Sequence, residues 1–163
     1  MRYLENAANI AIIFGVVVFL GVVVHSEFGK AKQPEMSAKA LIGQTIALPG
    51  VHFPAQQSSL IFAISSTCHF CKESEPFYRN LLAKSQGNVR MVAVLPQSQA
   101  EAESYIQQAA MPSVQVVSAE LDSIGVHATP TLLLVDENGK VQNAWIGELD
   151  GTRQQQVLSR VTR

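Results

Sequence analysis

Two cysteines, separated by two residues, most constrain what this chain can fold into. Cys68 and Cys71 are the only cysteines among its 163 residues. The apolar run Leu60–Ile64 comes shortly before them, and the polar, helix-compatible run Lys72–Glu75 follows them. The predicted order is a strand, then a short turn that holds a cysteine, then a helix. In this context a C-x-x-C motif is typical of a redox-active pair.

The start of the predicted helix favours reactivity at the first cysteine. The first backbone N–H groups of a helix have no partner within the helix, and the helix dipole is positive there. Both effects favour thiolate over thiol at Cys68. Cys71 turns back toward Cys68, close enough to close a small disulfide ring. The motif therefore predicts dithiol–disulfide exchange.

Two other interpretations of the cysteine pair stay open at this point. A single C-x-x-C motif is half of a structural zinc site, which needs two further ligands. The chain has no second cysteine pair and no H-x-x-x-H pair among its histidines, which are His25, His52, His69 and His127. The two cysteines could also be buried thiols without a role, although a chain with only two would seldom place them this way by chance.

The charge of the chain argues against one large class of partner. Lys and Arg number 12 and Asp and Glu number 13, so the formal net charge is -1, and no basic cluster occurs along the sequence. Nucleic-acid-binding domains carry a positive patch or stripe. We therefore expect no nucleic-acid partner.

The N-terminal region holds an apolar segment long enough to cross a lipid bilayer. No charged residue lies between Ala7 and Val24, and Asn9 is the only polar side chain there. A cleaved signal peptide would have a shorter apolar core and a small-x-small cleavage site, which His25–Phe28 does not offer. We therefore expect an N-terminal tail at residues 1–6, an uncleaved transmembrane anchor at 7–25, a linker at 26–40 and one folded domain at 41–163.

The charges at the two ends of this segment do not give its orientation. Arg2 and the α-amino group precede it, whereas Lys30, Lys32 and Lys39 follow it. Counting positive charges places the C-terminal domain in the cytoplasm, but a large domain translocates largely regardless of charge. A C-x-x-C domain tethered by one span has most use on the outer side of the membrane, where the cysteines of exported proteins must be paired correctly.

The remaining sequence alternates between strand and helix patterns. Apolar runs predict buried strands at Leu60–Ile64, Val89–Leu95, Val114–Val117 and Leu132–Val135. Helices are predicted from Cys71 to about Ser85 with a kink at Pro76, from the capping box Ser98–Glu101 toward Ala110, and after a cap at Asp150 or Thr152.

Two hairpins complete the predicted elements. A turn at Asp136–Gly139 leads to an antiparallel strand at Val141–Ile146, and weak alternation over Leu41–Phe53 suggests a short hairpin at a sheet edge. Strands that alternate with helices and end in a hairpin predict an α/β sandwich with a mixed central sheet.

Two proline positions strengthen the redox interpretation. Pro76 lies eight residues after Cys68, and Pro130 lies just before the strand at Leu132. A proline before a buried strand cannot donate to the sheet, so it belongs in a loop or at the start of the strand. The stretch from Gly125 to Val141 has the pattern G-V-x-x-T-P-T-x-x-x-V-D-x-x-G-K-V. Together these features resemble the thioredoxin superfamily.

A helix and a strand inserted between Gly87 and Asp122 make the chain similar to the membrane-tethered TlpA/ResA-type thiol:disulfide oxidoreductases. The resemblance covers about Leu41 to Val161 and implies a thioredoxin-like α/β/α sandwich. It implies protein thiols and disulfides as substrates, a membrane electron donor or acceptor, and no cofactor beyond the Cys68–Cys71 disulfide. It also implies a single-pass membrane protein, held in a lipid bilayer, with a periplasmic or other extracytoplasmic domain.

The resemblance assigns roles to four residues. Thr129–Pro130 would be a cis peptide packed against the Cys68 sulfur, and the Thr129 backbone would pair with an extended substrate segment. Cys68 would be the attacking thiolate, and Cys71 would resolve the mixed disulfide.

Three neighbours of the pair depart from family patterns. Thr67 replaces the tryptophan that many members carry before the first cysteine, Phe62 stands where thioredoxin has a buried acid, and Ser74 stands where ResA-like proteins have a glutamate. The proton acceptor for Cys71 is therefore unassigned. The carboxylates that flank Ser74, at positions 73 and 75, are expected to face water.

Three further residues are candidate modulators of the pair: His69, Phe70 and Glu75. A protonated His69 would stabilise a Cys68 thiolate and make the disulfide easier to reduce, but it could equally be a solvated turn residue. His127, close to Pro130 in sequence, is expected to be a surface histidine in a loop.

The leading hypothesis is a membrane-anchored thiol–disulfide oxidoreductase that acts as a reductase of exported proteins, for example in cytochrome c maturation. The alternative is a thioredoxin-like copper-binding or metallochaperone module that uses Cys68 and Cys71, with His127 as a third ligand. Soft thiolates select Cu(I), but the thioredoxin-like copper proteins typically separate the cysteines by three residues.

Overall fold

The computed structural model describes residues 38–162. The predicted tail at residues 1–6, the predicted anchor at 7–25 and the linker up to residue 37 lie outside the described residues. Within residues 38–162, no helix has the length and apolar character needed to span a bilayer. The first described helix, α2 (Ala38–Leu41), begins in the last part of the predicted linker.

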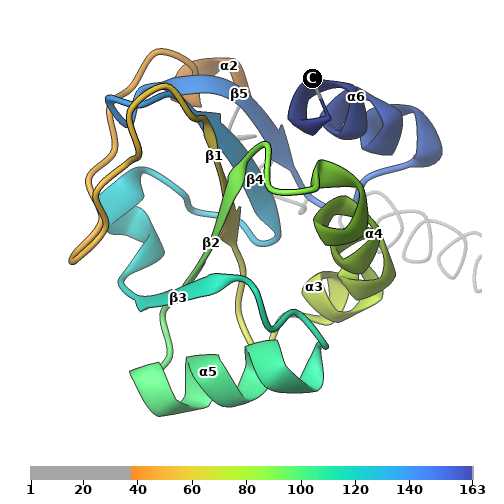
Figure 1. Ribbon diagram of the computed structural model, residues 1–163. Coiled ribbons are helices and arrows are strands. Elements are labelled where there is room, and N and C mark those ends of the chain that lie inside the picture. The colour runs from red at the N-terminus through yellow and green to blue at the C-terminus, as the bar shows by residue number, and fades with distance from the viewer. Residues whose placement is uncertain (1–37, 163) are drawn as a thin grey trace, which may run out of the picture. The chain divides into compact units, whose positions relative to one another are not determined.

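A mixed sheet of five strands lies at the centre of the described part, in the order β3-β2-β1-β4-β5 (Figure 1). The strands are β1 (Ser59–Ala63), β2 (Arg90–Leu95), β3 (Gln115–Ser118), β4 (Thr131–Val135) and β5 (Val141–Ile146). β1 and β3 each pair in parallel with β2, whereas β4 runs antiparallel to β1 and β5. The prediction of an α/β fold with a mixed sheet is confirmed.

Helices cover both faces of this sheet. They are α3 (His69–Glu73), α4 (Glu75–Ser85), α5 (Gln99–Gln108) and α6 (Gly151–Val161), together with a 3-10 helix at Leu121–Ile124. Figure 1 shows α4 and α6 as neighbours, and the two helices contact each other. Asp150 Oδ1 accepts a hydrogen bond from Arg153 N at 2.8 Å, so Asp150 is the cap of α6.

The apolar core lies in two layers, one on each face of the sheet. Leu60 and Phe62 of β1 pack with side chains of α4, α5 and α6. Ile61 and Ala63 point the other way and pack with α2, the segment 46–51 and the 3-10 helix. All five residues of β1 are buried, as predicted for a central strand covered on both faces. This buried strand ends shortly before the cysteine motif.

The predicted hairpin at Leu41–Phe53 is wrong. This segment instead runs along the turn before β5: Gly43 N donates to Val141 O at 2.8 Å, and Ile46 N donates to Gly139 O at 2.9 Å. Its apolar side chains at Ile46, Leu48 and Val51 cover the second face of the sheet. They are therefore used in packing, and the two halves of the segment do not pair with each other.

The predicted helix from Cys71 to Ser85 is two helices, α3 and α4, that meet at Ser74. Pro76 lies in the first turn of α4, where a backbone N–H has no partner within the helix, so the missing donor of proline costs little. The Ser74 hydroxyl donates to Phe70 O at 2.8 Å. The proline therefore starts a new helix where a kink within one helix was predicted, and the short α3 carries the cysteine motif.

The capping box predicted at Ser98–Glu101 is confirmed. Glu101 Oε2 accepts hydrogen bonds from Ser98 N at 3.1 Å and from Ser98 Oγ at 2.6 Å. These hydrogen bonds lower the pKa of the Glu101 carboxyl below its ordinary value, because they favour the charged form. The box fixes the start of α5, directly after the loop that follows β2.

Candidate active site

The two cysteines lie at the carboxyl end of β1, where the chain enters α3. Cys68 is the N-cap residue of α3, and its sulfur is bonded to that of Cys71. The Cys71 backbone N–H donates to Cys68 Sγ at 3.1 Å. A thiolate on Cys68 would keep this donor after reduction, because the donor belongs to the helix backbone. The geometry thus favours a reactive thiolate at the first cysteine.

The two sulfur-bearing residues differ in exposure. Cys71 is completely buried in the first core layer, whereas Cys68 is half-buried at the surface. A thiol or disulfide of another protein can therefore reach Cys68 but not Cys71. This asymmetry is what the predicted roles require, with Cys68 as the attacking and Cys71 as the resolving cysteine. The roles themselves stay a prediction.

Apolar side chains surround the buried Cys71. Phe62, at the position of the thioredoxin acid, is fully buried, and its ring centroid lies 5.1 Å from that of Tyr78 in an edge-on contact. Burial raises the pKa of the Tyr78 hydroxyl well above its ordinary value. Neither residue is an ionised partner for Cys71.

Glu75 does not face water, so that expectation is wrong for this residue. Its side chain is only 16% exposed and lies 3.7 Å from Arg79 Nη1, whereas Glu73 is 46% exposed. Burial, and then the negative charge of Glu75, raise the pKa of the Tyr105 hydroxyl on α5. The break between α3 and α4 rotates Glu75 toward α5. Its predicted role as a modulator of the cysteine pair stays a prediction.

The two residues between the cysteines are both exposed. His69 Nε2 lies 3.2 Å from Glu73 Oε1, one helical turn further along α3. Phe70 is 52% exposed, and within the described residues only Ile42 is another large apolar side chain of comparable exposure. The Phe70 ring meets His69 edge-on, with the centroids 5.6 Å apart. An aromatic ring that stays in water beside Cys68 is suited to contact another polypeptide.

The sheet brings the Thr-Pro loop to the same edge as the cysteines. β4 is antiparallel to β1, and Thr131 at its start pairs with Ala63 at the end of β1. The residues just before Thr131 and just after Ala63 therefore leave the sheet together. The Thr129–Pro130 peptide is cis, as the resemblance implied, and Pro130 is buried while Thr129 is half-buried. Pairing of Thr129 with a substrate and packing of Pro130 on Cys68 stay predictions.

The fold and the cysteine site both match a known protein family. The sequence pattern of the thioredoxin-like domain matches residues 54–162, which is more than half of the chain. The chain belongs to the thioredoxin-like family. With its Cys68–Cys71 disulfide, it is a thiol–disulfide oxidoreductase of that family, whose members act on protein thiols and disulfides. A search of curated proteins by sequence found no match.

Solved structures share the fold at low sequence identity. StoA from Bacillus subtilis has a TM-score of 0.54 at 20% identity, over 68% of this chain and 85% of StoA. A protein from Chlorobium tepidum assigned as thiol:disulfide interchange protein DsbE has a TM-score of 0.56 at 21% identity, over 74% of this chain and 99% of its own. The exposed lipoprotein thioredoxin Etrx1 of Streptococcus pneumoniae has a TM-score of 0.52 at 18% identity, over 64% and 84%.

His127 is an exposed side chain of this thioredoxin-like domain, as expected. Its Nδ1 lies 2.6 Å from Asp122 Oδ1, and both side chains are more than half exposed. Within residues 38–162, no group of three or more His, Cys, Asp or Glu side chains could hold a metal ion. The structure therefore does not bring His127 together with Cys68 and Cys71 as the ligands that the copper alternative needs.

Sequence reasoning missed Gln97, which reaches the turn before Cys68. Its side-chain amide donates to Ser65 Oγ at 2.9 Å, and its carbonyl oxygen accepts from Ser66 N at 3.4 Å. No local signal marks this glutamine, which follows β2 in a short polar loop. Only the parallel pairing of β1 with β2 indicates that the residues after both strands meet at one edge of the sheet.

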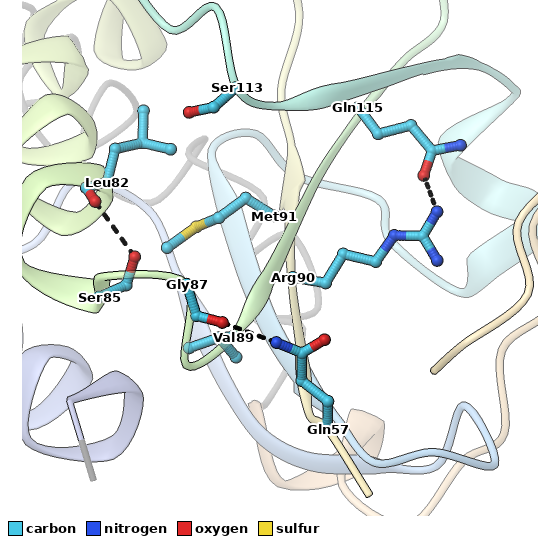
Figure 2. Close-up of a pocket in the computed structure, with 9 residues that line it drawn as sticks. All are labelled: Gln57, Leu82, Ser85, Gly87, Val89, Arg90, Met91, Ser113 and Gln115. Atoms are coloured by element: carbon cyan, nitrogen blue, oxygen red, sulfur yellow. Dashed lines mark hydrogen bonds between the residues drawn. The ribbon is translucent and has the colours of Figure 1, made fainter. Parts of the chain in front are cut away.

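A pocket of about 510 Å³ lies at the opposite end of the thioredoxin-like domain (Figure 2). It includes Arg90 and Gln115, the first residues of β2 and β3, whereas the cysteines follow the last residues of β1. Gln57 closes part of it by donating to Gly87 O at 2.7 Å. Because β1, β2 and β3 are parallel, this pocket is not part of the redox site.

Proposed function

We propose that this protein is a membrane-anchored thiol–disulfide oxidoreductase that reduces disulfides of exported proteins, for example in cytochrome c maturation. The observation that carries the proposal is the pairing of an accessible Cys68 at the N-cap of α3 with a buried Cys71. The Thr129–Pro130 loop at the same sheet edge supports it. In this arrangement a substrate can reach the Cys68 sulfur, while the buried Cys71 sulfur can react only with Cys68.

The reaction proceeds by two thiol–disulfide exchanges. The Cys68 thiolate attacks one sulfur of a substrate disulfide, which forms a mixed disulfide and releases the other substrate sulfur as a thiolate. Cys71 then loses its proton and attacks Cys68 Sγ, which releases the second substrate sulfur and forms the Cys68–Cys71 disulfide. Two electrons pass from the pair to the substrate, and a membrane electron donor must reduce the pair again.

The charges on α3 support the reductase direction. A positive charge beside Cys68 would stabilise its thiolate and so make the Cys68–Cys71 disulfide a stronger oxidant. When His69 is protonated, the Glu73 carboxylate 3.2 Å away offsets its charge. Glu73 thus offsets the charge that a protonated His69 places next to Cys68, and Lys72 is the other cation on α3. The offset at His69 suits a pair that gives electrons away.

The reduction potential of the Cys68–Cys71 pair is expected to lie near that of thioredoxin, which is about -270 mV. The potential of the oxidant DsbA is much less negative, about -120 mV. Equilibration of the purified full-length protein with glutathione buffers measures it. Glu73→Gln should move the potential to a less negative value, because it leaves the His69 charge unopposed. Glu103→Gln, on an exposed position of α5, is the matched control. A wild-type value near that of DsbA would contradict the reductase assignment.

The proposed anchor is the charge-free segment from Ala7 to Val24. The proposed location of the redox domain outside the cytoplasm rests on the resemblance to the TlpA/ResA-type proteins and on the presence of exported cysteines there. A reporter enzyme that is active only outside the cytoplasm, fused after Arg163, is therefore expected to be active in cells. A reporter that works only in the cytoplasm should be inactive at the same position. Deletion of residues 7–25 should release the first fusion from the membrane fraction. The reverse pattern of the two reporters would place the redox domain in the cytoplasm.

A further inference from the structure

The turn that leads into Cys68 is held mainly by polar contacts. Ser66 and Thr67 are exposed, and Ser65 is half-buried. Within the turn, Cys68 N donates to Ser65 O at 3.1 Å, and the hydroxyls of Ser65 and Thr67 lie 3.1 Å apart. A bulky residue at position 67 could hold such a turn by packing, but threonine is small and lies in water here. Contacts from outside the turn therefore add to these internal hydrogen bonds.

Gln97 supplies that external contact with both ends of its amide. The NH₂ group donates to Ser65 Oγ at 2.9 Å, and the carbonyl oxygen accepts from Ser66 N at 3.4 Å. One side chain thus fixes two successive residues of the turn. Gln97 is itself only half-exposed, so these hydrogen bonds are partly shielded from water.

The backbone of Gln97 is fixed by the neighbouring strand. The Ser118 hydroxyl at the end of β3 donates to Gln97 O at 2.6 Å, and Ala119 N donates to Leu95 O at 3.0 Å. The capping box at Ser98 then starts α5 directly after it. The backbone of Gln97 is therefore held between the ends of β2 and β3. Its side chain in turn holds the turn before Cys68 by hydrogen bonds.

We propose that Gln97 is a positioning residue for thiol–disulfide exchange, whose amide holds the turn 65–67 so that Cys68 stays at the N-cap of α3. The consequence for the chemistry passes through one hydrogen bond. Cys68 Sγ accepts from Cys71 N only while the Cys68 backbone keeps its extended N-cap conformation. Loss of the Gln97 contacts frees the turn, so Cys68 spends less time in the pose in which its thiolate is stabilised.

The test is the pH profile of alkylation of Cys68 in the reduced full-length protein. Gln97→Ala should move the profile upward by about 0.3 to 1 pH unit, which is about a two- to tenfold lower rate below the midpoint, the effect of one or two neutral hydrogen bonds. The substitution changes no charge near Cys68, where α3 carries His69, Lys72 and Glu73. Mass spectrometry identifies Cys68 as the residue that is alkylated first.

Gln99→Ala is the matched control. Gln99 also bridges to β3, with Ser118 N donating to Gln99 Oε1 at 3.1 Å and its own amide donating to Val116 O at 3.3 Å, but it does not contact the turn. Its profile should superimpose on that of the wild type. An equal shift in Gln99→Ala, or no shift in Gln97→Ala, would overturn the proposal, because the first result means general loosening and the second means no coupling.

Ser65→Ala keeps the test decisive if Gln97→Ala does not fold. It removes the hydroxyl that Gln97 holds, so it should shift the profile in the same direction. If the two residues act as one unit, the double variant should shift no further than the larger single effect. Fully additive shifts would contradict an action of Gln97 through Ser65. A wild-type protein without disulfide reductase activity would contradict the proposed function, whereas the alkylation profiles of the variants would still test the role of Gln97.

Discussion

Replacement of Cys71 by serine is expected to reduce disulfide reductase activity to the uncatalysed rate and to leave Cys68 covalently joined to its substrates. The half-buried Cys68 can still attack a substrate disulfide, but no buried thiol is left to release the mixed disulfide. The trapped species should run as high-molecular-weight bands on non-reducing gels of cell extracts and collapse on reduction. Insulin reduction by the purified protein measures the loss of turnover.

Cys68→Ser is the matched control for this prediction. It should lose turnover to the same extent but trap nothing, because Cys71 is fully buried and out of reach of a substrate. The proteins held by Cys71→Ser would also identify the substrates by mass spectrometry. Equal trapping by the two variants would show that the roles of the two cysteines are not distinct, and the proposed order of attack would be wrong.

Parts of the fold that depend on local patterns could be predicted from the sequence. The apolar run of β1 predicts a central strand by itself, and the Ser98–Glu101 box predicts a helix start by itself. The cysteine motif and the Thr129–Pro130 loop are also predictable from the sequence, because each is a short motif beside a recognisable strand. Their meeting at one sheet edge then follows from the antiparallel pairing of β4 with β1.

Parts that depend on distant partners could not be predicted. The segment after Leu41 alternates as a hairpin does, but its apolar side chains pack on the second face of the sheet. Glu75 has a spacing that suits a solvated helix position, yet its side chain is only 16% exposed and lies close to Arg79 and to Tyr105 of α5. The pairing of Gln97 with Ser65 joins two loops that are 32 residues apart. In each case a tertiary contact decides, and no short sequence window contains both partners.

The largest expected effect on stability is at Phe62, the residue that replaces the buried acid of thioredoxin. Phe62→Ala should lower the free energy of unfolding by about 3–5 kcal/mol, the range for a fully buried phenylalanine. The reasons are the cavity left within the central strand and the loss of the edge-on contact with Tyr78, whose ring centroid lies 5.1 Å away. Urea unfolding of the full-length protein, followed by circular dichroism, measures the change.

Phe70→Ala makes the same substitution at an exposed ring and should change the unfolding free energy by no more than about 0.5 kcal/mol. The two variants also separate stability from substrate contact. Phe70→Ala should weaken the reduction of protein disulfides while leaving that of small disulfides intact, because only a polypeptide is large enough to reach across the ring and the Thr129–Pro130 loop together. Equal destabilisation by both substitutions would contradict the difference in burial between the two rings.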